Sequence, residues 1–122
     1  MANDFKRFTV PSVNTSSGAS ASAVYTVPAG AGSSALESII IGITLANKTN
    51  SGVLASVFLD NYDGSNDVYI VKDATIPAGS SLEVMTGNKI VVQNNGSAGD
   101  AIRVSSNTSS TIDATISVLE DV

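Results

Sequence analysis

The stretch from residue 67 to residue 84 constrains the fold more than any other part of the chain. Val68–Val71 is a run of β-branched and aromatic residues, which is typical of a strand on a pleated, half-buried surface. Ile76-Pro77-Ala78-Gly79 then predicts a turn, because proline fixes φ and glycine adopts positive φ at little cost. Leu82 and Val84 resume the apolar alternation beyond it. The stretch therefore predicts short strands joined by tight turns.

The same pattern recurs along the chain and predicts about eight short strands. Val27-Pro28-Ala29-Gly30 repeats the turn motif, and Asp63-Gly64 favours a hairpin. Strands are expected at Ala23–Val27, Leu36–Ala46, Val53–Leu59, Val68–Val71, Leu82–Met85, Lys89–Val92, Asp100–Ser105 and Thr111–Glu120. This number of strands with regular turn spacing predicts an all-β domain, a two-sheet β-sandwich of the jelly-roll or immunoglobulin-like kind.

Alternation within these strands predicts which side chains form the core. The expected core residues are Ile39, Ile41, Val57, Ile70, Leu82, Ile102, Ile112 and Ile116. Leu36–Ala46 is the most apolar run, and the three consecutive isoleucines within it predict a strand that is covered on both faces. One face would meet the core, and the other would meet a second layer, the N-terminal segment or another subunit.

The first 22 residues differ in composition from the rest of the chain. Met1–Val10 is an aromatic and basic segment that contains Phe5, Lys6, Arg7 and Phe8. Ser12–Ser22 has the composition of a flexible linker. One interpretation is an N-terminal arm and Ser-rich linker at residues 1–22, which reaches a neighbouring subunit, followed by a β-sandwich domain at residues 23–122. The alternative is a first strand of the domain followed by a loose loop.

Composition also narrows the classes of function. Charged residues make up 14% of the 122 residues, whereas roughly 25% is usual for soluble domains. A surface rich in Ser, Thr, Asn and Gly can pack against neighbours without desolvating many ions, which suits assembly. The net charge of −5, with only six basic residues, argues against nucleic-acid binding. No apolar run approaches the ~18 residues of a membrane span, so no membrane association is expected.

The residue types argue against catalysis. The chain has no histidine and no cysteine, which removes most nucleophile–base pairs and most transition-metal sites. The remaining carboxylates that merit attention fall on separate predicted strands, at Glu37, Glu83, Asp100 and Asp113. Nothing in the pattern brings them together as an acid–base pair. We therefore expect no enzyme activity, no catalytic residues, no cofactor and no small-molecule substrate.

One loop offers oxygen ligands that could hold calcium. Asp60, Asp63 and Asp67 lie in it together with two asparagines. The spacing and the terminal glutamate of an EF-hand loop are missing, and a solvated hairpin loop requires the same residue types. The sequence therefore predicts a turn here and no metal site.

Five segments carry a resemblance to a known family. They are V-Y-T-V-P-A-G (Val24–Gly30), I-G-I-T-L-A-N (Ile41–Asn47), Y-I-V-K-D-A-T-I-P-A-G-S-S-L-E-V (Tyr69–Val84), G-D-A-I-R-V (Gly99–Val104) and A-T-I-S-V-L-E (Ala114–Glu120). In these segments and their order, the chain resembles small virion structural proteins of tailed bacteriophages, notably marine phages including those of cyanobacteria. The resemblance runs from about Ala23 to the C-terminus. It implies a component of the virion, assembled in the host cytoplasm, with no catalytic residues to transfer.

The resemblance also implies partners. Similar proteins look like capsid decoration (cement) proteins that bind the major capsid protein, often as trimers, so we expect a homotrimer that stabilises the head shell. The runner-up is a structural protein associated with the tail, neck or fibre. A host-surface binding module is a third hypothesis, for which Tyr62 is the only aromatic residue at a plausible loop tip. The candidate partner-binding residues are Phe5, Lys6, Arg7, Phe8, Ile39, Ile40 and Ile41.

Overall fold

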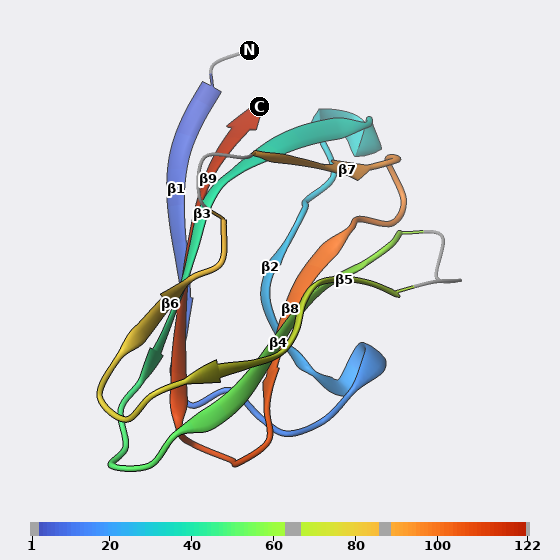
Figure 1. The fold of residues 1–122 in the computed structure, drawn as a ribbon. Coiled ribbons are helices and arrows are strands. Elements are labelled where there is room, and N and C mark those ends of the chain that lie inside the picture. Colours follow the sequence, from blue (N-terminus) through green and yellow to red (C-terminus); the bar gives the residue numbers. More distant parts are fainter. Residues whose placement is uncertain (1–2, 63–66, 86–88, 122) are drawn as a thin grey trace.

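The computed structural model describes residues 3–62, 67–85 and 89–121, and Figure 1 shows their arrangement. The described residues form nine strands and two short 3-10 turns, and they contain no α-helix. The strands are β1 (Asn3–Val10), β2 (Ser22–Thr26), β3 (Leu36–Asn47), β4 (Val53–Asp60), β5 (Asp67–Ile76), β6 (Ser81–Glu83), β7 (Ile90–Asn94), β8 (Ala101–Ser106) and β9 (Ile112–Asp121). The predicted turn at Asp63-Gly64 lies outside the described residues.

The strands pair in a nested antiparallel order. β1 pairs with β9, β2 with β8, β3 with both β6 and β7, and β4 with β5. Successive pairs alternate between two sheets. The first sheet has the order β1-β9-β3-β6, with β7 also on β3, and the second sheet has the order β2-β8-β4-β5. The two sheets face each other as a β-sandwich (Figure 1), and this nested order is that of a jelly roll. The predicted fold class is confirmed.

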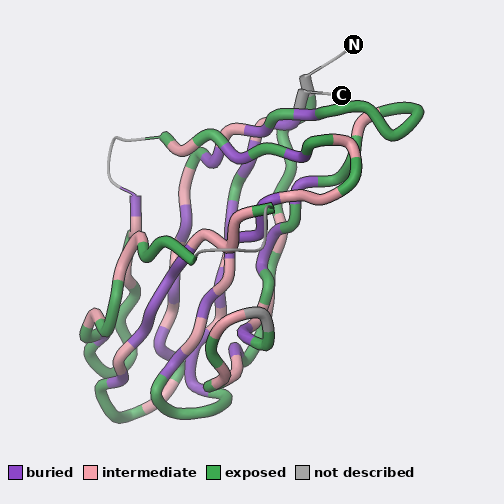
Figure 2. Tube along the Cα trace, turned by 90° about the vertical axis from the view of Figure 1, so that its right-hand side faces the viewer, coloured by how far each residue is buried: buried purple, intermediate pink, exposed green. Residues whose placement is uncertain are grey.

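The core lies between the inner faces of the two sheets. Figure 2 shows buried residues alternating with exposed or half-buried ones along the strands, as side chains on a sheet with one covered face must do. Four of the predicted core residues are completely buried: Val57, Ile102, Ile112 and Ile116. Ile70 and Leu82 are partly buried and pack against this cluster. Full burial of each such aliphatic side chain contributes about 1.5–3 kcal/mol to stability.

The predicted phase of β3 is wrong. Ile40, Ile43 and Leu45 face the core and are completely buried, whereas Ile39 is only half-buried and Ile41 is exposed. The pairing with β9 shifts register between Ile40 and Gly42, so Ile41 is the extra residue of a β-bulge. The bulge moves the inward positions by one residue, which period-two alternation does not anticipate. The isoleucine run is therefore covered by the core on one face only.

Residues 3–22 belong to the sandwich. β1 pairs with β9 over eight consecutive positions without a register shift. Val13 is completely buried and donates its backbone N–H to the carbonyl oxygen of Ile112 at 2.9 Å. Asn14 accepts a hydrogen bond from the backbone N–H of Ser22 at 3.2 Å and closes the intervening loop. Of the two interpretations of this segment, the structure shows the first strand followed by a loop, and not the arm, because β9 and the core bind the segment directly.

The two Pro-Ala-Gly motifs form different structures. In the second, the N–H of Ser80 donates to the carbonyl oxygen of Pro77 at 3.1 Å, and Gly79 has a φ of 68°, as the predicted turn requires. In the first, Gly30 has a φ of −72° and its N–H donates to the carbonyl oxygen of Ser34 at 2.8 Å. The shared sequence motif thus forms the predicted turn at the crossover from β5 to β6 but not between β2 and β3.

Candidate functional site

A row of apolar side chains crosses the outer face of the first sheet. Phe5 on β1 lies opposite Leu119 on β9, Leu119 lies opposite Ile39 on β3, and Ile39 lies opposite Val91 on β7. Directly opposed residues of antiparallel strands share one face of the sheet. Phe5 is 79% exposed and Val91 is 57% exposed, while the two side chains between them are half-buried. We call these four residues the outer row.

Toward the bulge, the surroundings of the outer row carry few charges, whereas on the opposite side the exposed Glu37 lies beside the row and opposite Gln93. The exposed Ile41 of the bulge follows Ile39 on the same strand. The next row along the sheet contains Arg7, Ser117 and Gly42. Beyond it, three threonines lie opposite one another at Thr9, Thr115 and Thr44. An apolar patch within a mainly uncharged polar surface is the composition of a protein–protein contact, because few ions have to lose water when it is covered.

The structure separates the seven predicted partner-binding residues. Phe5 and Ile39 lie in the outer row, and Arg7 and Ile41 lie beside it. The remaining three face the inside of the sandwich, at Lys6, Phe8 and Ile40. Ile40 is completely buried, so it offers no surface to a partner. Phe8 packs on Tyr25 with ring centroids 4.9 Å apart. Phe5 and Phe8 thus lie on opposite faces, as three-residue spacing on a strand dictates.

Two members of the outer row were not among the predicted site residues. Leu119 follows the alternating inward residues of β9 and takes an outward position, where an apolar side chain is unusual. Val91 lies within Ile90-Val91-Val92, a run in which one of three apolar residues has to face outward. The sequence therefore contained a signal that each of these two apolar residues faces outward. Only the pairing register shows that both of them join Ile39 and Phe5 in one row.

A buried polar network fastens β1 to the sandwich. The Nζ atom of Lys6 lies 2.8 Å from Oε1 of Glu120, which is 1% exposed. The hydroxyl of Tyr25 donates to Oε2 of Glu120 at 2.5 Å and lies 2.8 Å from the hydroxyl oxygen of Ser38. Burial, together with the hydrogen bond to Glu120, raises the pKa of the Tyr25 phenol well above its usual range. The hydrogen bond to Glu120 and its charge also raise the pKa of Lys6.

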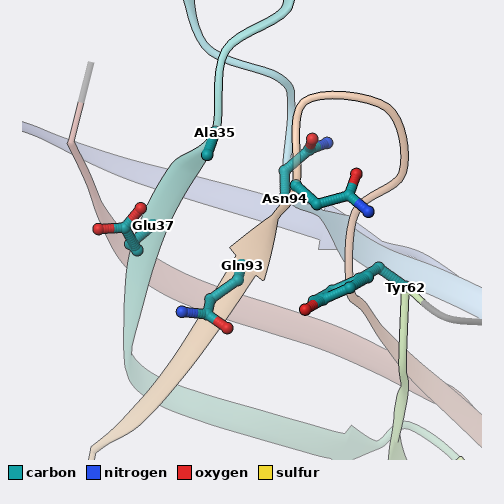
Figure 3. Close-up of a pocket in the computed structure, with 6 residues that line it drawn as sticks. Ala35, Glu37, Tyr62, Gln93 and Asn94 are labelled. Carbon is teal, nitrogen blue, oxygen red and sulfur yellow. The ribbon is translucent and has the colours of Figure 1, made fainter.

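A polar pocket of about 250 Å³ lies at one end of the sandwich. Its lining includes Glu37, Tyr62, Gln93 and Asn95, and Figure 3 shows Gln93 between Glu37 and Tyr62. The buried Asp100 positions the pocket, because its carboxylate accepts the backbone N–H of Tyr62 at 2.8 Å and that of Gln93 at 2.9 Å. The lining supplies one exposed ring, one carboxylate and three side-chain amides, which can hydrogen-bond a small polar ligand, and it contains no nucleophile with an adjacent base.

The carboxylates that the sequence singled out take part in separate contacts. The hydroxyl of Thr44 donates to Glu83, and Lys48 forms an ion pair with Asp113 at 2.9 Å. In the loop whose oxygen ligands were weighed for calcium, Asp60 pairs with Arg103 at 2.9 Å, and Asp63 lies outside the described residues. Among residues 3–62, 67–85 and 89–121, no three acidic, histidine or cysteine side chains come together as ligands for a metal ion. In the same residues, no helix is long and apolar enough to cross a membrane.

Comparisons with known proteins give no assignment. No protein-family model matches the chain, and a search of curated proteins finds no match to it.

Proposed function

We propose that this chain is a bacteriophage virion structural protein that decorates the capsid and stabilises the head shell. The observation that carries the proposal is the outer row, an exposed apolar stripe across four strands of a domain with few surface charges. Covering such a stripe with a large, stationary partner removes its apolar area from water. The resemblance of five segments to small virion proteins supplies the class of partner, the major capsid protein.

The fold is compatible with this role by analogy. Jelly rolls occur in viral capsid and lectin domains, among others, so the fold alone does not choose between them. The two sites support a protein partner, because the outer row is apolar and exposed, whereas the pocket at Tyr62 is small and has a single exposed ring. A homotrimer remains the expected state on the capsid, and a position at the tail, neck or fibre is the alternative within the same class.

The number of copies per particle tests the proposal. Quantitative mass spectrometry of purified virions of the phage that encodes this chain should find hundreds of copies per particle, as a shell-covering protein requires. A small copy number that is a multiple of six or twelve would instead place the protein on the tail axis and contradict the decoration role. Absence of the chain from purified particles would overturn the assignment to the virion altogether.

A matched pair of variants tests whether the outer row makes the contact. Val91→Asp places a charge in the outer row, and Val68→Asp places the same charge on β5 in the second sheet, where the valine is 52% exposed. Neither substitution affects a buried side chain, so both variants should keep the β spectrum in circular dichroism. Binding to particles that lack the protein should fall at least about tenfold for Val91→Asp only, because a charge covered without a partner is costly. Equal binding of both variants would exclude the outer row.

Glycan binding at a host surface is the candidate from a different class. The pocket lined by Tyr62, Glu37 and Gln93 favours it, because an exposed ring beside hydrogen-bonding groups is the chemistry that sugars require. A glycan array probed with the wild-type protein and with Tyr62→Ala tests this role. A specific signal that the substitution removes would support it, and no signal from the wild-type protein would exclude it.

A further inference from the structure

β1 is an edge strand whose second side is open. Within the described residues β1 pairs only with β9, and Figure 1 shows β1 at the margin of the molecule with no strand beyond it. Its eight residues contain no proline and pair with β9 without a register shift. A regular edge strand presents unpaired N–H and C=O groups to the outside and is a template for another strand.

We propose that a second copy of this chain binds this edge. The two β1 strands would run antiparallel, related by a two-fold axis at Phe5, and would join the two first sheets into one. This inference does not depend on the function proposed above, since it follows from the open edge of β1, its register and its charges. It also gives a two-fold contact, which differs from the trimer that the resemblance suggests.

The alternation of faces along β1 limits the possible registers. Residues 5, 7 and 9 face outward, and residues 4, 6, 8 and 10 face the inside of the sandwich. Both sandwiches keep their cores on the same side only if each residue opposes one that has the same orientation. A symmetric pair of β1 strands therefore places one residue of β1 opposite its own copy, on the axis.

Charge decides which residue lies on the axis. An axis at Asp4, Lys6 or Arg7 would put two like charges directly opposite each other, which destabilises an antiparallel pair. An axis at Phe8 would place Lys6 opposite the apolar Val10 of the other copy. An axis at Phe5 instead places Asp4 opposite Lys6 of the second copy, and this opposite-charge pair occurs twice. The register with its axis at Phe5 is therefore the one that pairs opposite charges.

The same register makes the outer rows continuous. Phe5 would contact Phe5 of the second copy on the outer face, so that the two outer rows join end to end. The 79% exposed ring of Phe5 would then be covered on one side by the ring of its copy. The contact thus combines backbone pairing, two ion pairs and aromatic burial around one axis.

Lys6 is the residue that could prevent this pairing. An inward-pointing charge on an edge strand is a common means of blocking edge-to-edge association. Here the charge of Lys6 is already balanced by Glu120 at 2.8 Å, and Asp4 of the second copy would lie opposite it. The side chain of Lys6 is 42% exposed, which leaves it room to contact both carboxylates.

Sedimentation of the wild-type protein and a matched pair of variants tests the contact. The wild-type chain should form a dimer at micromolar concentration. Asp4→Lys turns both attractive pairs into repulsive ones and should weaken self-association about tenfold or more. Asp67→Lys makes the same change at the exposed start of β5 and should leave the dimer intact. A monomeric or trimeric wild type, or equal dimerisation of the two variants, would overturn the proposal.

Cysteine cross-linking then tests the register. The chain contains no cysteine, so a single introduced thiol gives an unambiguous product. Phe5→Cys should form a disulfide-linked dimer on mild oxidation, because directly opposed residues have Cα atoms about 4.5–5.5 Å apart, a separation that a disulfide spans. Arg7→Cys lies on the same face two residues away and should stay largely monomeric under the same conditions. Preferential cross-linking of Arg7→Cys, or of neither variant, would contradict an axis at Phe5.

Discussion

The two long edge strands, β1 in the first sheet and β5 in the second, have different degrees of regularity. β1 pairs with its neighbour over eight consecutive residues without interruption. β5 pairs with β4 with two register shifts, and Asp73 within it has a positive φ of 52°. Lys72 of β5 also lies over the ring of the exposed Tyr69, 4.9 Å from its centroid. Bulges discourage edge pairing, so the irregular β5 is better protected than the regular β1.

The two edges also differ in how they are fastened to the core. β1 contributes Phe8 to the packing on Tyr25 and Lys6 to the buried network around Glu120. β5 contributes the completely buried Ile76, while most of its other side chains are exposed or half-buried. β1 is thus bound on its inner face and available on its outer edge. A strand with this combination can hold a domain together and still accept a partner.

Deleting residues 1–10 should give the largest effect on stability. The deletion removes Phe8 and Val10 from the core and leaves the buried Glu120 without its ammonium partner. We expect a loss of about 3–6 kcal/mol, which approaches the net stability of a small domain. Urea unfolding followed by circular dichroism measures this loss. An unchanged midpoint would mean that the segment is an independent arm rather than a strand.

A pair of aromatic substitutions compares the two edges at a single residue. Phe8→Ala should cost about 2 kcal/mol, a value reduced from that of a fully buried phenylalanine because Phe8 is half-buried. Tyr69→Ala on β5 should cost less than about 1 kcal/mol, because Tyr69 is 47% exposed and contacts Phe58 at a centroid distance of 5.4 Å. The urea midpoints of the two variants measure these losses of stability. Equal losses would show that the two edge strands contribute equally to the stability of the domain.

Alkaline pH should produce the smallest effect of the three, and only on the β1 side. The pKa values of Tyr25 and Lys6 are raised in the folded protein, so both groups keep protons at a pH where the unfolded chain releases them. Unfolding then releases protons, and the free energy of unfolding falls as the pH rises above about 10, the ordinary pKa of tyrosine. Their stabilising contribution is complete below that pH.

A tyrosine control assigns the alkaline effect. Thermal unfolding between pH 8 and pH 11 should show a smaller loss of stability in Tyr25→Phe than in the wild-type protein, since one of the two shifted groups is gone. Tyr69→Phe on β5 should retain the full loss. If both variants match the wild-type protein, the network around Glu120 does not control the alkaline response.

The sequence determined the strands but not the orientation of every residue. Eight predicted strands are present close to their expected positions, because β-branched runs and Pro-Gly turns act locally. Ile112 and Ile116 are buried as their alternation predicts. Ile39 and Ile41 are not, since a bulge between Ile40 and Gly42 arises from pairing with a strand about 75 residues later in the chain. Local periodicity contains no information about such a shift.

Only the tertiary structure shows that β1 is a strand of the sandwich and where the outer row lies. Composition allowed residues 1–22 to be interpreted as an arm and a linker. In the fold, Phe8 and Val13 pack against the core, and the segment is bound to the domain. Phe5, Ile39, Val91 and Leu119 are far apart in sequence and meet only through three pairing registers. Glu120 likewise contacts Lys6 and Tyr25, which are distant from it in sequence, only through the fold. The sequence determines which side chains can be apolar or charged, and the pairing of distant strands determines which of them share a surface.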